Sequence, residues 1–289
     1  MTGDMTRRGN SNGTAYPYFL TRVVRTRRIT PNLVRITVGG DGLAEYPYSA
    51  PDQWMKLFFP LPGQDEPIVP EVEGDDVAAW YRRFQAMPDD IRPNMRTFTV
   101  RAHRPGDDEL DIEFVLHGDQ EGHGPASRWA SHARPGDPLG MLAGPSAFAP
   151  PADAPWLLLA GDHSALPAIA SSVESLAPGT RALAYVELDD PADQQSLPAS
   201  PDVLVHWVYR DAGSERGQAL VEELRRTDLP AGTPYVWLAG EAGMVRTLRR
   251  HLTGDRGIDK KAVTFVGYWR RGKTELDAYT EQELADARS

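Results

Sequence analysis

The sequence changes its pattern once, at the proline-rich stretch 150–155. Before this stretch, short runs of β-forming residues are separated by turn residues, which is typical of antiparallel sheets. After it, apolar runs of strand length alternate with segments of helical composition, which is typical of a parallel sheet covered by helices. The chain is therefore predicted to form two domains, residues 17–150 and 151–289, after a flexible N-terminal arm of residues 1–16.

The first domain is predicted to be a small β-barrel. Its β-rich runs lie at residues 20–28, 33–38, 54–59, 96–103, 110–117 and 139–142. The Pro-Gly-Asp-Asp turn at 105–108 joins two of these runs as a hairpin. Residues 61–90 look like an insertion with one helical patch, and a short helix is expected at 126–133. Six short strands with so little helix predict a six-stranded antiparallel barrel.

The second domain is predicted to be a doubly wound α/β fold. Its apolar runs lie at residues 156–160, 182–188, 203–208, 236–239 and 263–266. They are too continuous to have a solvated face, so we expect strands of a parallel sheet that is buried on both sides. Helices are expected at 165–175, 217–226 and 241–252, with a C-terminal helix at 274–287. Such sheets bind ligands where their strands end, at the carboxyl edge.

Composition excludes several kinds of site. The 289 residues contain no cysteine, which excludes disulfides, thiolate nucleophiles and cysteine-held metal centres. The net charge of -10 argues against general attraction to nucleic acid or to an anionic membrane, so an anionic ligand needs a local basic patch. No apolar run approaches the length of a membrane span, and the histidines lack ligand spacing. We expect a cytoplasmic, monomeric protein without a metal site.

The strand at 96–101 places a cation beside an aromatic ring. Arg96, Phe98 and Val100 share one face, because side chains alternate along a strand. A guanidinium is suited to bidentate phosphate binding, and a ring two residues away is suited to stacking on a flat heterocycle. The same pattern also fits an amphipathic strand with Phe98 in the core and solvated arginines. Pattern alone leaves both interpretations open.

Two helix starts and one strand end are further candidates. The turn at 161–164 connects a strand to a helix, and Gly124 to Ser127 begin another helix, so both fit a phosphate at a helix N-terminus. Capping by Asp162, Ser164 or Ser127 explains the same residues without a ligand. Residues 267–272 end the last strand with two aromatic residues and two arginines, which fit either a binding surface or ordinary core packing.

In this order, the segments resemble the siderophore-interacting protein family, the flavin reductases of ferric siderophores in the ferredoxin-reductase-like superfamily. The resemblance extends from about residue 19 to residue 272. It rests on residues 55–60 (MKLFFP), 96–101 (RTFTVR), 114–118 (FVLHG), 124–129 (GPASRW), 160–169 (AGDHSALPAI), 239–242 (AGEA) and 267–270 (GYWR). It implies an FAD-binding barrel, an NAD(P)H-binding α/β domain, and a reductase that converts a ferric siderophore to Fe(II) and so releases iron.

The resemblance also assigns residues to the cofactors. It implies cofactor contacts from Arg96, Thr97, Phe98, Thr99, Arg101, His117, Gly124, Ala126, Ser127, Asp162, Ser164 and Trp269. Thr99 is expected near flavin N5, Glu241 near the reacting ring, and Trp269 over the flavin until nicotinamide arrives. Two departures stand out: Phe98 replaces the usual Tyr, and Asp-His-Ser at 162–164 replaces Asp-Glu-Thr. The first keeps a stacking surface but removes a phenolic hydrogen bond.

The resemblance leaves the substrate patch, the acceptor and the coenzyme open to alternatives. Lys56, Arg128 and Arg270 are the implied contacts of an anionic ferric siderophore, although they also fit ordinary surface charges. A reductase that serves a protein or free-flavin acceptor, and a siderophore-binding protein without turnover, remain as alternatives. In a standard dinucleotide fold, the acidic stretch 187–190 disfavours the 2′-phosphate of NADPH. The resemblance implies that this superfamily reads that phosphate elsewhere, and Arg210 at the end of the next strand offers a cation for it, so both NADH and NADPH stand.

Overall fold

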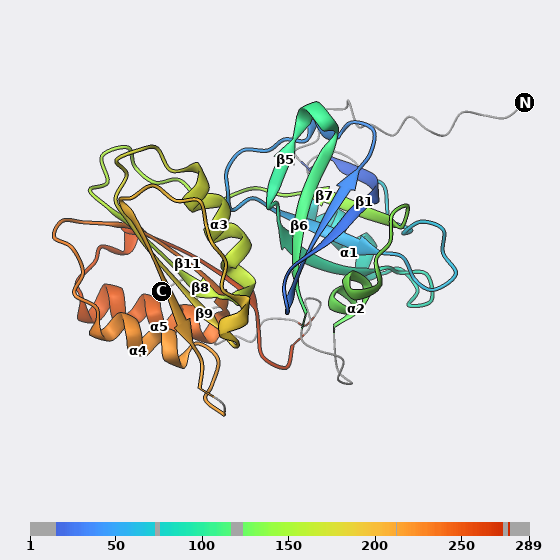
Figure 1. The fold of residues 1–289 in the computed structure, drawn as a ribbon. Coiled ribbons are helices and arrows are strands. Elements are labelled where there is room, and N and C mark those ends of the chain that lie inside the picture. Colours follow the sequence, from blue (N-terminus) through green and yellow to red (C-terminus); the bar gives the residue numbers. More distant parts are fainter. Residues whose placement is uncertain (1–15, 73–75, 117–123, 212, 274–276, 278–289) are drawn as a thin grey trace, which may run out of the picture. The chain divides into compact units, whose positions relative to one another are not determined.

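The computed structural model describes residues 16–72, 76–116, 124–211, 213–273 and 277 (Figure 1). The chain divides into two compact units, Met1–Ser146 and Ala147–Ser289. Three predicted features lie outside the described residues: residues 1–15 of the predicted arm, His117, and the C-terminal helix expected at 274–287 except for residue 277.

The first unit contains a 7-stranded antiparallel sheet in the order β4-β3-β7-β1-β2-β6-β5. The strands are β1 Tyr18–Thr30, β2 Leu33–Gly39, β3 Trp54–Phe59, β4 Asn94–Thr99, β5 Ala102–Arg104, β6 Glu109–Val115 and β7 Pro138–Ala143. Two α-helices accompany it, α1 Val77–Gln85 and α2 Pro125–His132. The predicted hairpin is present, because the turn Pro105–Asp107 connects β5 to β6.

One bent segment joins the two ends of this sheet. The Val100 backbone N–H donates to the carbonyl of Gln53 at 2.8 Å, beside β3. The next backbone N–H, that of Arg101, donates to the carbonyl of Asp111 in β6 at 2.9 Å. The chain therefore passes from one end of the sheet to the other between β4 and β5 and closes a barrel. If β4 and β5 are taken as one bent strand, the barrel has the predicted six strands.

Two apolar clusters support the first unit. Inside the barrel, alternate residues of the strands pack around fully buried side chains such as Ile36, Leu57 and Ile112. On the barrel's outer side, Phe58 contacts Trp80 and Phe84, which both come from α1. The predicted insertion at 61–90 thus contains a helix that covers this outer side of the barrel.

The second unit contains a 5-stranded parallel sheet in the order β10-β9-β8-β11-β12. The strands are β8 Leu157–Asp162, β9 Ala182–Leu188, β10 Val203–Tyr209, β11 Tyr235–Glu241 and β12 Val263–Trp269. The helices are α3 Leu166–Ser175, α4 Gln218–Arg226 and α5 Ala242–Arg250, and α5 continues into one π-helical turn, His251–Asp255. Short 3-10 turns lie at Leu43–Glu45, Pro105–Asp107, His163–Ala165, Pro191–Asp193 and Lys260–Ala262.

Helices cover both faces of the parallel sheet. Leu157 and Leu159 of β8 pack with Ile169 of α3 on one face. Leu158, between them, points the other way and packs with Leu248 of α5, and α4 lies beside α5 on that face (Figure 1). The two faces use alternate residues of the same strand, which explains why its sequence is continuously apolar. The predicted doubly wound fold is confirmed.

Candidate functional site

In the second unit, several of the predicted site residues form hydrogen bonds to one buried carboxylate. Asp162 is the last residue of β8. Its Oδ1 atom accepts hydrogen bonds from the Ser164 backbone N–H at 2.9 Å and from the Ser164 hydroxyl at 2.5 Å. Its Oδ2 atom accepts from the Glu241 backbone N–H at 2.8 Å and from the Trp269 indole N–H at 2.9 Å. The carboxyl ends of β8, β11 and β12 therefore meet at one side chain.

Glycines make room for this arrangement. A Cβ atom on Gly161 would lie 2.5 Å from the Ala165 Cβ and from the Ala239 carbonyl oxygen. Gly240 has φ 132°, and a Cβ there would lie 2.7 Å from Cγ of Asp162. The small residues in the sequence patterns at 160–165 and 239–242 are thus needed for close approach of two strand ends. Asp162 also caps the turn that follows it, so the capping alternative holds for this residue.

Glu241 ends β11 and begins α5. Its Oε2 atom accepts a hydrogen bond from the Met244 backbone N–H at 2.8 Å, which makes Glu241 the N-cap of that helix. Its own backbone N–H is held by Asp162. The residue is half-buried, so part of it is accessible at the carboxyl edge of the sheet.

A second acidic residue lies beside Asp162 in the sheet. Glu187 is the register partner of Asp162 on β9 and is buried. Its carboxylate accepts the backbone N–H of Gly217 at 2.6 Å and that of Leu220 at 3.1 Å, both at the start of α4. Burial raises the pKa of Glu187, while these two hydrogen bonds act in the opposite direction. Glu187 thus ties β9 to α4.

Two arginines grip a third carboxylate at the same edge. Asp189 follows β9 directly and accepts from Arg210 Nε at 2.8 Å through Oδ1, while Arg216 Nη2 lies 2.5 Å from Oδ2. The guanidinium carbon of Arg216 also lies 6.0 Å from the centre of the Trp269 ring. Arg216 was not among the predicted site residues, because it stands in a loop without a motif. Gly217 after it has φ 84°, a conformation that favours glycine, but a single glycine in the sequence gives no signal for the arginine before it.

In the first unit, β4 presents the predicted strand. Arg96 is half-buried, and its Nη1 donates to the Met95 carbonyl at 2.6 Å. The Phe98 ring is half-buried and lies 4.4 Å from the Phe114 ring, centre to centre, so one side of it packs against the barrel core. Thr99, at the end of the strand, is buried. Phe98 therefore packs against the core, as in an amphipathic strand, and is still partly accessible, as stacking on a ligand requires.

Arg101 takes part in a buried ion network. Its Nε atom lies 3.5 Å from Oε1 of Glu113, whose side chain is 0% exposed. Arg35 approaches the same oxygen at 2.5 Å. Two arginines thus share one carboxylate on β6, next to the bend that closes the barrel. This places Arg101 where it holds the strand that carries Arg96 and Thr99.

The start of α2 has no side-chain cap among the described residues. Gly124 is its N-cap residue, and its side of the helix carries no side-chain hydrogen bond. A Cβ atom on Gly124 would meet no atom of the described residues within 4 Å. Ala126 and Ser127 lie in the first turn, where backbone N–H groups have no partner within a helix. Ser127 is therefore not the cap that the alternative in the sequence analysis supposes.

The three predicted substrate contacts lie on different elements. Lys56 Nζ donates to the Thr97 hydroxyl at 2.7 Å and lies 5.5 Å from the centre of the Trp54 ring. Arg128 is exposed on α2, and Arg270 is half-buried directly after β12. Lys56 and Arg128 belong to the first unit and Arg270 to the second.

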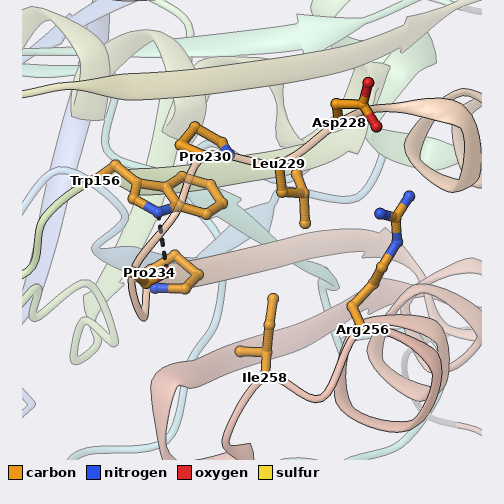
Figure 2. A pocket seen from close by; sticks show the side chains of 8 residues that line it. Trp156, Asp228, Leu229, Pro230, Pro234, Arg256 and Ile258 are labelled. Carbon is orange, nitrogen blue, oxygen red and sulfur yellow. Dashed lines mark hydrogen bonds between the residues drawn. The ribbon is translucent and has the colours of Figure 1, made fainter.

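A hollow of about 300 Å³ lies at the opposite, amino edge of the parallel sheet (Figure 2). It is lined by Trp156, Asp228, Leu229, Pro230, Gly232, Pro234, Arg256 and Ile258. Arg256 donates to the carbonyls of Arg225 at 2.7 Å and Thr227 at 2.9 Å, so it caps the end of α4. The hydrogen bonds of Arg256 in this hollow are therefore those of a helix cap.

Neither a metal cluster nor a membrane helix is found in the parts of the chain that the structure describes. No group of three or more His, Asp and Glu side chains there is arranged to hold a metal ion. No helix in the same ranges has the length and apolarity needed to cross a membrane.

Family models match both units. The model described as siderophore-interacting FAD-binding domain matches residues 22–148, and the model described as siderophore-interacting protein matches residues 154–272. The chain belongs to the siderophore-interacting protein family. This confirms the resemblance inferred from the motifs, including those of the first unit.

Relatives of this family member cover nearly all of its length. The ferric vibriobactin reductase ViuB of Vibrio cholerae is 31% identical over 92% of this chain and 94% of its own. The NADPH-dependent ferric-chelate reductase of Escherichia coli is 31% identical over 86% and 91%. The crystal structure of a siderophore utilization protein from T. fusca is 34% identical, with a TM-score of 0.77 over 91% of this chain and 96% of that one.

More distant structures share the fold alone. The ferredoxin-NADP+ reductase from Plasmodium falciparum is 11% identical, with a TM-score of 0.61 over 87% of this chain and 97% of that one. The barrel followed by a parallel-sheet unit is thus the ferredoxin-reductase-like arrangement of elements.

Proposed function

We propose that this protein is an FAD-containing reductase that uses NAD(P)H to reduce a ferric siderophore to Fe(II) and so releases the iron. The FAD-binding family model and the two relatives named as ferric reductases support it. The observation that carries the proposal is the convergence of Ser164, Glu241 and Trp269 on Asp162 at the carboxyl edge. This edge is where doubly wound sheets bind nucleotides.

The residues of the first unit fit FAD. The start of α2, which no described side chain caps, offers backbone N–H groups of Ala126 and Ser127 to a pyrophosphate. Gly124 has no side chain to block this approach, and a Cβ there would meet none of the described atoms within 4 Å. Arg96 on β4 supplies a guanidinium for the same group. Phe98 offers the accessible side of its ring for stacking on the isoalloxazine.

The polar contacts of the flavin edge would come from the backbone and hydroxyl groups of Thr97 and Thr99. A phenylalanine at position 98 leaves stacking as its only contribution, since it has no hydroxyl to donate. When bound, FAD supplies a carrier that takes up a hydride and returns electrons one at a time.

The chain's own groups at the carboxyl edge position the nicotinamide. Asp162 holds the indole of Trp269, and Ser164 lies on the other oxygen of the same carboxylate. Glu241 adds a carboxylate at the start of α5. In this proposal, Asp162 fixes where the indole of Trp269 rests, at the edge where the nicotinamide would bind.

Iron release follows from the ligand preferences of the metal. Ferrous iron is a softer partner for anionic oxygen ligands than ferric iron, so reduction weakens the chelate. The protein carries a net charge of -10, so an anionic chelate must be attracted locally. Lys56, Arg128 and Arg270 are the proposed local cations.

An anaerobic stopped-flow titration of the FAD-loaded protein tests this function. We expect NADH or NADPH to bleach the flavin absorbance, and a ferric siderophore to restore it while Fe(II) appears in a ferrous-specific chelator. The gallium(III) complex of the same siderophore is the matched control, because it has similar size and charge but accepts no electron under these conditions. It should bind without restoring the colour.

The other functions give different results in the same experiment. Faster recovery with ferredoxin, cytochrome or free flavin than with any ferric siderophore would identify a different acceptor. A protein that binds the siderophore but is not bleached by either coenzyme would be a binding protein without turnover. A preparation that takes up no FAD would contradict the proposal altogether.

A further inference from the structure

The ion cluster around Asp189 lies at the carboxyl edge of the parallel sheet, where β9 and β10 end. β9 is the neighbour of β8, and Asp189 follows it directly at the carboxyl edge. In doubly wound folds, an acidic residue after the second strand accepts the ribose 2′-hydroxyl of NAD, whereas an arginine nearby accommodates the 2′-phosphate of NADP. This chain has both residue types at that position, so their mutual arrangement decides between the two coenzymes.

The arginines are already engaged. Each oxygen of Asp189 has its own arginine: Oδ1 takes Arg210 at 2.8 Å, and Oδ2 takes Arg216 at 2.5 Å. All three side chains are partly sheltered, with 32% of Asp189, 22% of Arg210 and 31% of Arg216 exposed. Further contacts hold the arginines in place, because Arg210 Nη1 donates to the Ser214 carbonyl at 2.9 Å and Arg216 lies against the Trp269 ring.

The carboxylate is charged at neutral pH. Partial burial acts to raise the pKa of Asp189, but the hydrogen bond from Arg210 and the charges of both arginines outweigh it, and the pKa is lowered. A 2′-phosphate would bring a second anion next to this carboxylate and compete with it for the same guanidinium groups. A ribose 2′-hydroxyl is neutral and donates a hydrogen bond to a carboxylate.

We propose that Asp189 selects NADH over NADPH by keeping Arg210 and Arg216 engaged and by repelling a 2′-phosphate. This inference rests on the proposed function, because it names the coenzyme of the same site. The E. coli relative is named for NADPH. The preference proposed for this chain follows instead from its own Asp189 and the two arginines that Asp189 holds.

Isothermal titration with two nucleotides that differ only at the 2′ position tests the inference. Adenosine 5′-monophosphate (AMP) and adenosine 2′,5′-bisphosphate (2′,5′-ADP) both present an adenosine end, and neither requires turnover. We expect the wild type to bind AMP at least about tenfold more tightly, which corresponds to about 1.4 kcal/mol. In Asp189→Asn the arginines are released and the repulsion is lost, so the preference should shift toward 2′,5′-ADP by at least about tenfold.

Matched variants separate this effect from a general change of charge. Asp211→Asn removes one negative charge from an exposed residue next to Arg210 and should leave the preference unchanged. Arg216→Gln in the Asp189→Asn background should remove the gain for 2′,5′-ADP. Asp189→Glu keeps the charge and should keep the preference for AMP, which tests the inference even if Asp189→Asn does not fold.

Failure of the inference is distinguishable from failure of the proposed function. Tighter binding of 2′,5′-ADP to the wild type, or an unchanged preference in Asp189→Asn, would overturn the role of Asp189 while the flavin could still be reduced by a coenzyme. If neither nucleotide binds and neither NADH nor NADPH bleaches the flavin, both are overturned.

Discussion

The indole N–H of Trp269 donates a hydrogen bond to Oδ2 of Asp162 at 2.9 Å, although 107 residues separate the two in the sequence. The same oxygen accepts the backbone N–H of Glu241. The position of an aromatic ring at the end of β12 therefore depends on a carboxylate at the end of β8. Any change at Asp162 is expected to alter both the stability of the sheet and the resting position of the ring.

Asp162→Ala is expected to lower the free energy of unfolding by about 2–3 kcal/mol, because several sheltered donors lose their charged acceptor. Trp269→Phe keeps an aromatic ring but removes one donor, so its cost should be nearer about 1 kcal/mol. Urea denaturation of the two variants and of the double variant measures this. Costs that simply add in the double variant would show that the two side chains do not interact.

Glu113→Gln tests the ion network behind the flavin strand. Removing the charge leaves Arg35 and Arg101 without their shared carboxylate, and breaking a buried pair in this way costs about 3 kcal/mol or more. Glu66→Gln is the control, since its pair with Arg22 is 46% and 54% exposed and should contribute less than about 1 kcal/mol. Urea unfolding measures the free energy of unfolding of both variants. Similar decreases in the two would contradict the expectation that the buried ion pair contributes more than the exposed one.

The raised pKa of Glu187 gives a pH dependence with a definite sign. Burial is its main cause, so above the usual value of 4.5 the folded protein binds more protons than the unfolded chain. The contribution of this residue to stability must therefore fall as the pH rises through the window that begins near 4.5. Glu187→Gln does not titrate. Its stability relative to the wild type should improve between about pH 4.5 and pH 7, and a constant difference over this range would contradict the prediction.

Lys56→Glu tests the proposed substrate patch. Reversal of this charge is expected to weaken binding of an anionic ferric siderophore severalfold, and more strongly at low salt because exposed charges are screened within about 10 Å at 0.1 M. Fluorescence quenching at two ionic strengths measures the affinity. Lys261→Glu makes the same charge change at the amino edge of β12 and should have no effect. Unchanged affinity in Lys56→Glu would remove Lys56 from the patch.

The elements were predictable from the sequence where one physical pattern dominates. Residues 54–59 and 182–188 are strands with the expected bounds, because alternation or continuous apolarity leaves little choice. The bend at Val100 was not predicted, because its hydrogen-bond partners lie on two strands that are distant in the sequence. Local patterns carry no information on such pairings.

The candidate site shows the same division. Glycines and helix starts pointed to Asp162 and Ser164, since a tight strand-to-helix turn has a local signature. Asp189 and Arg210 were noted in the sequence, but their partner Arg216 was not, because the loop that contains it has no such signature. Charges that meet across loops depend on tertiary structure, and the sequence alone does not reveal which of them pair.

The bent segment that closes the barrel has a consequence for how this protein reaches its working state. Its hydrogen bonds to Gln53 on one side and to Asp111 on the other connect the two ends of the sheet. They can form only when both ends of the sheet are in place. The strand with Arg96 and Thr99 leads into these hydrogen bonds, so the place proposed for the flavin is next to the place where the barrel closes. A ligand bound there would stabilise the closed barrel. Its loss is expected to weaken first the hydrogen bonds of Val100 and Arg101 that close it.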